Sequence, residues 1–376
     1  MPHETFEFRI GFRKLLIGVF LTVVPISLVA IYAVSESASS QEAQVGYHFK
    51  TIAESTATQV AQFIHGRVIE AGLMAANPAV IDVVTAANRS YQGMSESAIG
   101  ARIKQREDIW TTPAADRLVK EILSSRASRV LRRYLQIDPT FLRITVTDEK
   151  GTTTAATHKT IDYFQADEEF WQNIYAQGRG AISLTDIEYD VVTKANYIGV
   201  GVPIVDEESG GLIGTLDALV EVSSLFPIVR RATLGATGRA LLVKDDGTVI
   251  SGPQTTLSMN LKSDEYAAVL DALQTLRGRA TGYVVADFGG DRGEAVIGYA
   301  DTGLKEDFQN LSWVVLVSQP GDEAFAPIVT AQRLIMIIAF LGIAAAVMLA
   351  VYFSLHRRAE MEELEEEFHT PRDNRS

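Results

Sequence analysis

The chain has 376 residues, of which 47% are hydrophobic, and it carries a formal net charge of −13. A chain of this length can bury cores in two domains of ordinary size. Its acidic balance disfavours binding to the phosphate backbone of nucleic acids. The absence of cysteine excludes disulfide bonds, thiolate metal ligands and a cysteine nucleophile.

Two long stretches without a charged residue, 15–34 and 334–355, predict membrane-spanning helices. Each supplies about 20 residues, enough to cross about 30 Å of hydrocarbon. Basic residues precede the first stretch and follow the second, so both ends of the chain, 1–14 and 356–376, are expected in the cytoplasm and the chain between the spans outside. The alternative for the first stretch is a cleaved signal peptide, although its apolar core is longer than is usual for one.

Residues 35–83 predict a long stalk helix, with its probable end at Asn77-Pro78. Apolar residues recur there at spacings of three and four, at Val45, Phe49, Ile52, Val60 and Phe63, with Thr56 at the missing step. This seam could pair with a second copy of the chain or pack along its own domain.

The next region, up to residue 137, predicts shorter helices. A short helical piece and a polar loop occupy 79–109, and Pro113 opens a strongly amphipathic segment. Four arginines lie in this segment, at 126, 129, 132 and 133. A solvated helix face is favoured for them over a binding surface.

One hairpin pattern then occurs twice. Residues 142–148 and 152–157 are strands joined by a turn that ends in Gly151, and residues 240–244 and 248–251 repeat strand, acidic-glycine turn and strand. Two such hairpins, each leading into a mixed strand and helix region, indicate an internally duplicated module.

Further strands are expected after each hairpin. They cover 197–205 and 211–222 in the first half, and 282–288, 295–300 and 313–319, preceded by a helix over 263–277, in the second. Each half is therefore predicted to be an antiparallel sheet with helices on a face, an α+β arrangement.

The order of the predicted spans, stalk helix, hairpins and strands resembles that of the double Cache sensor domains of bacterial chemoreceptors and histidine kinases. These domains are PAS-like. The resemblance covers 35–327 and rests on Tyr163 with Trp171, LTDIEYD at 184–190, and the stretches 200–225, 235–253 and 312–328. It implies two tandem modules, a membrane-distal one over 84–230 that binds a small molecule and a membrane-proximal one over 231–331. It also implies a bacterial inner-membrane protein whose sensor region lies in the periplasm or outside the cell.

The stretch 162–203 is the densest in aromatic and acidic residues. An apolar wall with a few carboxylates suits a small cationic or zwitterionic ligand, and the resemblance implies that the ligand region lies here. The candidate ligand-binding residues are Tyr163, Trp171, Tyr175, Asp186, Tyr189, Asp190, Tyr197 and Asp217. Tyr163 and Trp171 could equally be core residues.

Family members that bind amino acids share a Tyr, Arg, Trp and Asp pattern. No arginine stands just before Trp171, and Leu219 occupies the position where the aspartate would be sought, with Asp217 two residues earlier. An amine or another small polar compound is therefore expected rather than an α-amino acid.

A single strand over 185–190 would put Asp186, Glu188 and Asp190 on one face, either in the cavity or in solvent. The solvated position is favoured for Glu188.

The sequence contains no catalytic motif, so neither an enzyme nor a cofactor is expected. None of the six histidines stands four residues from another, and no metal site is predicted.

Only 21 residues follow Leu355, so the sensor is expected to signal through a separate protein. The expected partners are a small-molecule ligand, the lipid bilayer, this signalling protein and, through the stalk, a second copy of the chain, with no nucleic acid. A structural or adhesive surface protein and a fragment of a longer receptor are the alternatives.

Overall fold

The computed structural model describes residues 12–252, 261–275 and 280–369, which divide into two compact units. The smaller unit contains the two ends of the chain, up to Val45 and from Gly321, and the larger unit is Gly46–Pro320. Parts of the predicted terminal segments, before residue 12 and after residue 369, lie outside the described residues, as does the predicted end of the 263–277 helix.

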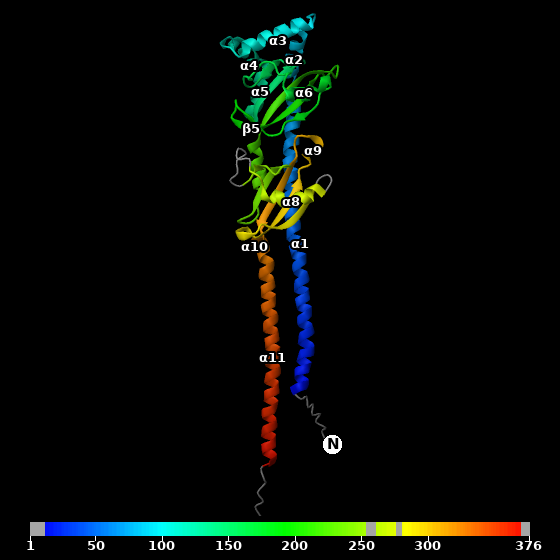
Figure 1. Ribbon diagram of the computed structural model, residues 1–376, viewed down its shortest axis with the longest axis vertical. Helices are drawn as coiled ribbons and strands as arrows, with labels where there is room; N and C mark the ends of the chain where they lie inside the picture. Colours follow the sequence, from blue (N-terminus) through cyan, green and yellow to red (C-terminus); the bar gives the residue numbers. More distant parts are fainter. Residues whose placement is uncertain (1–11, 253–260, 276–279, 370–376) are drawn as a thin grey trace, which may run out of the picture. The chain divides into compact units, whose positions relative to one another are not determined.

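The first helix, α1 (Phe12–Ala75), runs along the larger unit from Gly46 onward (Figure 1). Its buried side chains recur at spacings of three or four and include Phe49, Ala53, Thr56, Ala57, Val60 and Ile64. A Cβ on Gly46 would lie 2.2 Å from the Tyr283 ring, which requires glycine there. Much of the apolar seam predicted for the stalk is thus buried against the chain's own domain.

The stalk helix ends at Ala75, close to the probable end predicted at Asn77-Pro78 and before residue 83. After Ala75 the chain turns, and the Asn77 side chain accepts a hydrogen bond from the Ala79 backbone N–H at 3.0 Å, which caps α2 (Pro78–Arg89). The helices that follow are α3 (Glu96–Trp110), η1 (Pro113–Ala115), α4 (Asp116–Leu123) and α5 (Arg126–Ile137).

The first sheet has six strands in the order β2-β1-β6-β5-β3, with β4 also paired to β5. The strands are β1 (Phe141–Asp148), β2 (Thr153–Ala156), β3 (Ser183–Leu184), β4 (Glu188–Asp190), β5 (Ala195–Val205) and β6 (Leu212–Glu221). The short helices α6 (Glu169–Tyr175) and η2 (Ala176–Gly178) lie between β2 and β3, and α6 packs on β5 and β6. We call this part of the fold, with α2 to α5, the distal module, after the predicted position of this half of the chain far from the membrane.

The second sheet repeats the plan of the first with five strands, in the order β8-β7-β11-β10-β9. Its elements are β7 (Arg239–Lys244), β8 (Val249–Ser251), α8 (Asp264–Thr275), β9 (Thr281–Asp287), η5 (Gly290–Arg292), β10 (Glu294–Asp301), α9 (Leu304–Asp307) and β11 (Trp313–Pro320). In both sheets the hairpin strand pairs with the last strand of its module, which confirms the predicted pair of α+β modules. We call this part the proximal module.

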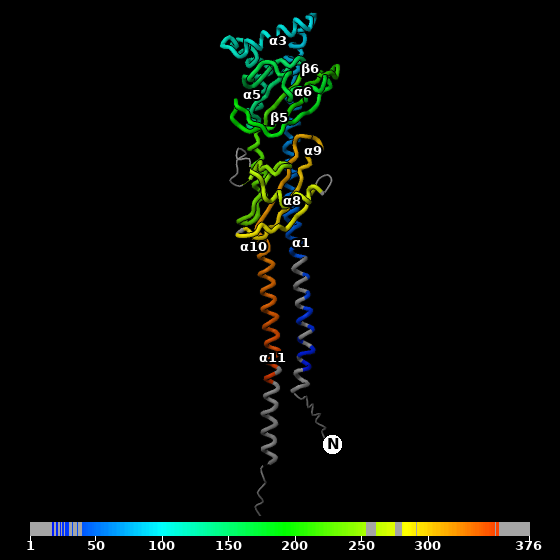
Figure 2. Tube along the Cα trace, viewed as in Figure 1, coloured from blue at the N-terminus to red at the C-terminus, as the bar shows by residue number. Residues whose placement is uncertain are grey.

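The chain passes from β6 to β7 through η3 (Val222–Leu225) and α7 (Phe226–Arg230), as the trace in Figure 2 follows. Tyr266 of α8 packs with Val269, Ile297 and Leu316 in the core of the proximal module. All ladders of both sheets are antiparallel, so short connections suffice between neighbouring strands.

The predicted single strand over 185–190 is wrong, because the chain leaves the sheet between β3 and β4. The cause is Thr185, whose Oγ1 accepts a hydrogen bond from the Gly199 backbone N–H at 2.9 Å. A side chain thereby takes the acceptor role of a backbone carbonyl, and the ladder resumes only at Glu188.

In the smaller unit, α10 (Gly321–Ala324) precedes α11 (Ala326–His369). Among the described residues, the stretch Ala326–Leu349 of α11 is long and apolar enough to cross a membrane, with a mean hydropathy of 2.2. It overlaps the predicted span 334–355 and begins earlier. The other predicted span, 15–34, is helical within α1 and stays a prediction.

Candidate functional site

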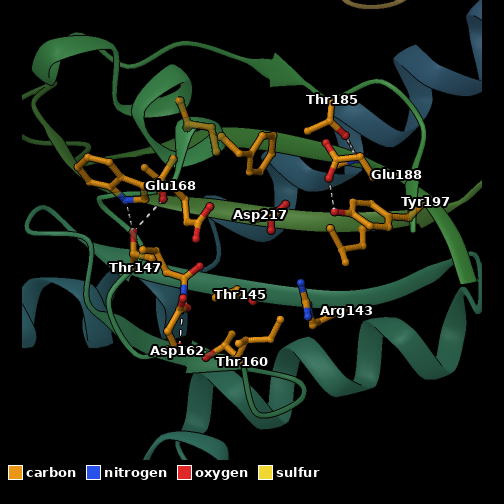
Figure 3. Close-up of a pocket in the computed structure, with 18 residues that line it drawn as sticks. Arg143, Thr145, Thr147, Thr160, Asp162, Glu168, Thr185, Glu188, Tyr197 and Asp217 are labelled. Carbon is orange, nitrogen blue, oxygen red and sulfur yellow. Dashed lines mark hydrogen bonds between the residues drawn. The ribbon is translucent and has the colours of Figure 1, made fainter. Parts of the chain in front are cut away.

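The floor of a cavity of about 280 Å³ is formed by one face of the distal sheet (Figure 3). Thr145 of β1 lies opposite Asp217 of β6, and Arg143 lies opposite Leu219. Because side chains alternate along a strand, Arg143, Thr145 and Thr147 share one face with Asp217 and Leu219. The antiparallel register therefore gathers residues from distant parts of the sequence.

The other walls come from α6, from the segment before it, and from the β3–β4 segment. The lining residues are Arg143, Thr145, Thr147, Thr160, Ile161, Asp162, Gln165, Glu168, Phe170, Trp171, Ile174, Thr185, Glu188, Tyr197, Gly199, Thr215, Asp217 and Leu219. The cavity is mixed in character, with apolar side chains, hydroxyl groups and carboxylates.

Two glycines of β5 allow α6 to lie close to the sheet. A Cβ on Gly201 would lie 2.3 Å from Ile174 Cδ1 and 2.8 Å from Phe170 Cζ, both on α6. At Gly199 a Cβ would lie 3.2 Å from Thr185 and 3.3 Å from Phe170 Cζ of α6. Larger residues on this strand would push α6 outward and change the shape of the cavity.

Trp171 of α6 is fixed to the floor of the cavity. Its Nε1–H donates to Thr147 Oγ1 at 2.9 Å, and Thr147 Oγ1 lies 2.8 Å from Thr215 Oγ1 of β6. On its other side the indole stacks on the Tyr175 ring with centroids 4.5 Å apart. The indole is thus oriented in advance, as a rigid aromatic wall requires.

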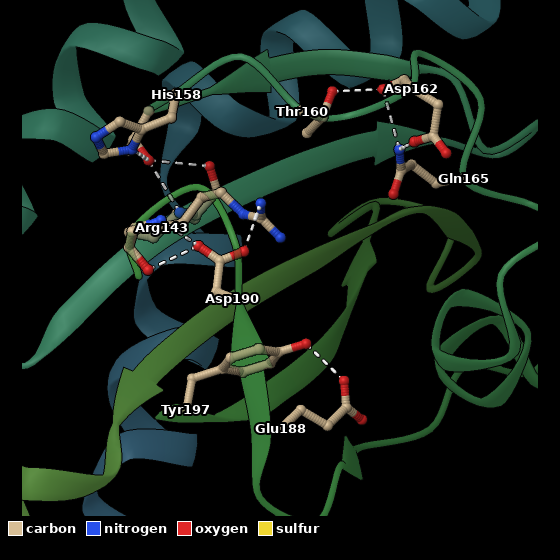
Figure 4. Close-up of polar contacts among 11 residues, drawn as sticks. Arg143, His158, Thr160, Asp162, Gln165, Glu188, Asp190 and Tyr197 are labelled. Atoms are coloured by element: carbon tan, nitrogen blue, oxygen red, sulfur yellow. Dashed lines mark hydrogen bonds and ion pairs between the residues drawn. The ribbon is translucent and has the colours of Figure 1, made fainter. Parts of the chain in front are cut away.

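Arg143 lines the cavity and is held by Asp190 of β4 (Figure 4). A guanidinium nitrogen lies 3.1 Å from Asp190 Oδ1, and both side chains are largely buried. Asp190 Oδ2 also accepts hydrogen bonds from the Thr193 backbone N–H at 2.8 Å and hydroxyl at 2.6 Å. Burial acts to raise the pKa of Asp190, but the Thr193 hydrogen bonds and the charge of Arg143 together lower it below its usual value.

Asp217 is a carboxylate without a hydrogen-bond partner at one oxygen. Its Oδ1 is buried and unpaired among the described residues, as is Nε of Arg143. Burial raises the pKa of Asp217 to about 7, although Arg143 opposes this, while Glu188 and Asp190 add to it. A buried polar atom without a partner is costly, and in a cavity it indicates a position where a ligand group can bind.

Three more carboxylates stand around the cavity. Glu188 accepts a hydrogen bond from the Tyr197 hydroxyl at 2.6 Å, and burial together with this carboxylate raises the pKa of Tyr197. Burial and neighbouring carboxylates raise the pKa of Asp162 and of Glu168. Burial is the larger cause of these pKa shifts, and the excess of negative charge around the cavity adds to it.

The structure brings three of the eight predicted residues to this cavity, namely Trp171, Tyr197 and Asp217. Asp190 lies behind Arg143, and Tyr175 lies behind Trp171. Tyr189 is 57% exposed. Asp186 pairs instead with Lys244 of the proximal module, with Oδ2 and Nζ 2.6 Å apart.

Tyr163 belongs to the core of the distal module. It is 2% exposed and packs with Trp110, Ile122 and Ala156. Its hydroxyl accepts a hydrogen bond from Arg106 at 3.0 Å. Of the two alternatives weighed for Tyr163, packing is therefore the one observed.

Sequence reasoning missed Arg143, which lines the cavity. It favoured solvent for Glu188, which is exposed and also lies at the rim of the cavity. The alternation of LRITVTD at 142–148 already puts Arg143, Thr145 and Thr147 on one face. Pairing of β1 with β6 places this face beside Asp217. Neither strand contains a local sequence pattern that predicts the pairing.

No group of three histidine or acidic side chains in the described part of the chain is arranged to hold a metal ion. The polar groups of the cavity are hydroxyls, carboxylates, an amide and a guanidinium, which suit reversible recognition of a small organic molecule.

Comparison with known proteins gives one family. A family model described as "Cache domain" matches residues 37–328, well over half of the chain. A comparison with curated proteins found no match.

Solved structures with limited similarity include the ligand-binding domains of bacterial chemoreceptors. The ligand-binding domain of the Pseudomonas aeruginosa chemoreceptor PctB in complex with L-Gln has 16% identity and a TM-score of 0.42, over 74% of this chain and 92% of that one. That of PctC from the same organism, in complex with GABA, has 15% identity and a TM-score of 0.44, over 72% and 98%. That of Pseudomonas fluorescens CtaA, in complex with L-leucine, has 13% identity and a TM-score of 0.43, over 78% and 99%. By the family match, which spans both modules, the chain belongs to the Cache domain family.

Proposed function

We propose that the protein is a membrane-anchored extracytoplasmic sensor whose distal cavity binds a small, positively charged organic molecule. The observation that carries the proposal is the buried, unpaired Oδ1 of Asp217 in a cavity of about 280 Å³. A cationic group there would supply the missing hydrogen bond and favour the ionised carboxylate.

The charges around the cavity support a cation over an anion. Four of the lining side chains carry a carboxyl group, at 162, 168, 188 and 217, and one carries a guanidinium. That guanidinium, on Arg143, is already paired with Asp190. An incoming anion would meet several carboxylates and a cation whose charge is offset, whereas an amine would be attracted.

The β3–β4 segment offers a route from the cavity to the proximal module. Thr185 and Glu188 line the cavity, while Asp186 between them pairs with Lys244 at the end of β7. The Leu184 carbonyl accepts a hydrogen bond from the Asn310 side chain at 2.9 Å. Movement of this segment on ligand binding would therefore act on two points of the proximal module.

From the proximal module the signal would pass into α11, whose stretch Ala326–Leu349 is apolar enough to span a membrane. With 15–34 as a second span, both termini would be cytoplasmic and the sensor region would face the periplasm or the cell exterior. A separate signalling protein would receive the change. A homodimer through the stalk would bury Tyr47, Ile69 and Leu73, which are 59%, 64% and 63% exposed on α1.

A thermal-shift screen of the full chain in detergent tests the proposal, with amines, amino acids, carboxylates, sugars and nucleobases as the panel. A ligand at about one hundred times its dissociation constant should stabilise the fold by about 2.7 kcal/mol. We expect organic cations to be the active class and Asp217→Asn to remove the shift. Asp167→Asn changes an exposed aspartate that does not line the cavity, so the ligand-induced thermal shift should be retained in this variant.

Stabilisation by anions alone would contradict the proposal. An increase in melting temperature with cations that is unchanged in Asp217→Asn would contradict it too. A screen in which no class of compound changes the melting temperature would contradict it as well.

A further inference from the structure

We propose that the ligand is a short linear diamine, bound with one ammonium group at each end of the distal cavity. This inference rests on the proposed function and specifies its ligand. It follows from the distribution of the carboxylates, from the pairing of the arginine, and from the surface between the two ends.

The carboxylates of the cavity are spread along it rather than gathered at one point. Figure 3 draws Glu168 and Asp162 on the side of Thr147, Glu188 on the side of Tyr197, and Asp217 between them. A single ammonium group can approach only part of this set. A molecule with two separated cationic groups can reach both ends at once, with Asp217 within reach of either group.

Asp217 is half-buried, and its Oδ1 is the carboxylate oxygen of the set that is both enclosed and without a partner among the described residues. Glu168 and Glu188, by contrast, are exposed residues at the rim of the cavity. A charge pair in a buried position is screened less by solvent than one at the rim. Asp217 should therefore contribute more to the affinity than either rim glutamate.

The pairing of Arg143 argues against a zwitterion. An α-amino acid would need a cation for its carboxylate, and Arg143 is the only cationic side chain among the lining residues that the structure describes. Asp190 lies 3.1 Å from one nitrogen of that guanidinium and offsets its charge, so the unpartnered Nε of Arg143 belongs to a cation that is already neutralised. Glu188 lines the same cavity, so an added carboxylate would also meet like charge.

The surface between the ends suits methylene groups. Phe170 and Ile174 of α6 face the cavity from one side, and Leu219 of β6 contributes to its floor. Trp171 adds an aromatic face, which attracts ammonium as well as methylene groups. A cavity of about 280 Å³ is small for a ligand site, so the chain that joins the two amines must be short.

Isothermal titration of the full chain in detergent tests this inference with four probes that share a four-carbon chain. They are 1,4-diaminobutane, butylamine, 4-aminobutanoate and 1,4-butanediol, and the diamines with three, five and six carbons test the length. We expect one of the diamines to bind about tenfold more tightly than the monoamine of equal length. Neither the zwitterion nor the diol should bind measurably.

Two rim variants test the placement of the ligand. Glu168→Gln and Glu188→Gln remove one carboxylate from each end, and each should lower diamine affinity severalfold, toward the value for butylamine. Glu208→Gln, in an exposed turn of the same module, is the matched control and should leave the affinity unchanged.

A monoamine that binds as tightly as the diamine of its length, or a zwitterion that binds more tightly, would overturn the inference. If no diamine binds but another organic cation stabilises the protein and depends on Asp217, the inference fails and the proposed function stands. If diamines bind equally to wild type and both rim variants, the placement fails and the inference with it.

Discussion

Asp186 and Lys244 join the two modules of this protein: Oδ2 of the first lies 2.6 Å from Nζ of the second. Asp186 belongs to the segment that lines the distal cavity through Thr185 and Glu188, and Lys244 ends β7 of the proximal sheet. In the β7–β11 ladder Lys244 lies opposite Trp313. This ion pair therefore links the segment beside the candidate ligand site to β7, which pairs with β11, the strand that precedes α10 and α11.

We expect Lys244→Met to uncouple the modules with little loss of stability. The side chains are 44% and 24% exposed, so solvent screens the pair and its loss should cost about 0.5 kcal/mol. Hydrogen exchange of the full chain should show slower exchange in β7 when a stabilising amine binds the wild type. In Lys244→Met, slowing should be confined to the distal module. Lys305→Met, which removes a pair with Asp245 inside the proximal module, is the control, and equal slowing of β7 in all three proteins would contradict the route.

Gly201→Ala should destabilise the distal module and disturb the cavity. The added Cβ would lie 2.3 Å from Ile174 Cδ1, so α6 must shift, at a cost of about 1–3 kcal/mol in the free energy of unfolding. Gly100→Ala in α3 is the matched control, because a Cβ there meets no atom within 4 Å and alanine favours a helix by about 0.5–1 kcal/mol. Chemical denaturation measures both. Equal effects of the two substitutions would show that α6 does not need the close approach.

Asp217→Asn should make the ligand-free protein more stable than wild type at alkaline pH. The pKa of Asp217 is raised to about 7, so its contribution to stability is present at low pH and is lost as the pH rises through about 7. Asparagine avoids the buried charge. Between pH 5 and 8 the wild type should lose roughly 1–3 kcal/mol relative to the variant. A stability difference that does not change with pH would show that Asp217 does not titrate in this range.

Asp190→Asn should show the opposite dependence of stability on pH from that of Asp217→Asn. Because the native environment lowers the pKa of Asp190, its contribution is present above the pKa of the unfolded chain and is lost as the pH falls through the native value. At pH 7 the variant leaves Arg143 without its carboxylate and should be less stable by about 1–3 kcal/mol. The difference from wild type should shrink below about pH 4. Denaturation curves at several pH values measure it, and a difference that grows toward acid would contradict the pairing.

The predicted membrane topology can be tested by thiol labelling, because the natural chain has no cysteine. In spheroplasts of expressing bacteria, a membrane-impermeant maleimide should label Glu208→Cys. His3→Cys and Ser376→Cys should react only after permeabilisation, since both termini are predicted to be cytoplasmic. Loss of residue 3 from the mature protein would instead indicate a cleaved signal peptide. Labelling of Ser376→Cys in intact spheroplasts would contradict the orientation of the second span.

Local patterns predicted much of this architecture. The alternation within 142–148, the acidic-glycine turns and the period of 35–76 depend on neighbours a few residues apart, so the two hairpins and the long helix are found close to their expected bounds. The break at Thr185 was missed because a threonine hydroxyl took a place in the ladder, which no periodicity reveals. Tyr163 and Tyr175 were selected for their residue type, but packing against Trp110 and Trp171 holds them outside the cavity wall.

The sequence by itself therefore determined the two modules, the apolar stretches and the acidic, aromatic character of one region, because composition and short-range periodicity encode these properties. Tertiary structure alone decided which residues face one another. Arg143 meets the site only because β1 pairs with β6, and Asp190 then offsets its charge. Ligand choice depends on distances between charges from separate strands, and those distances exist only after the chain has folded.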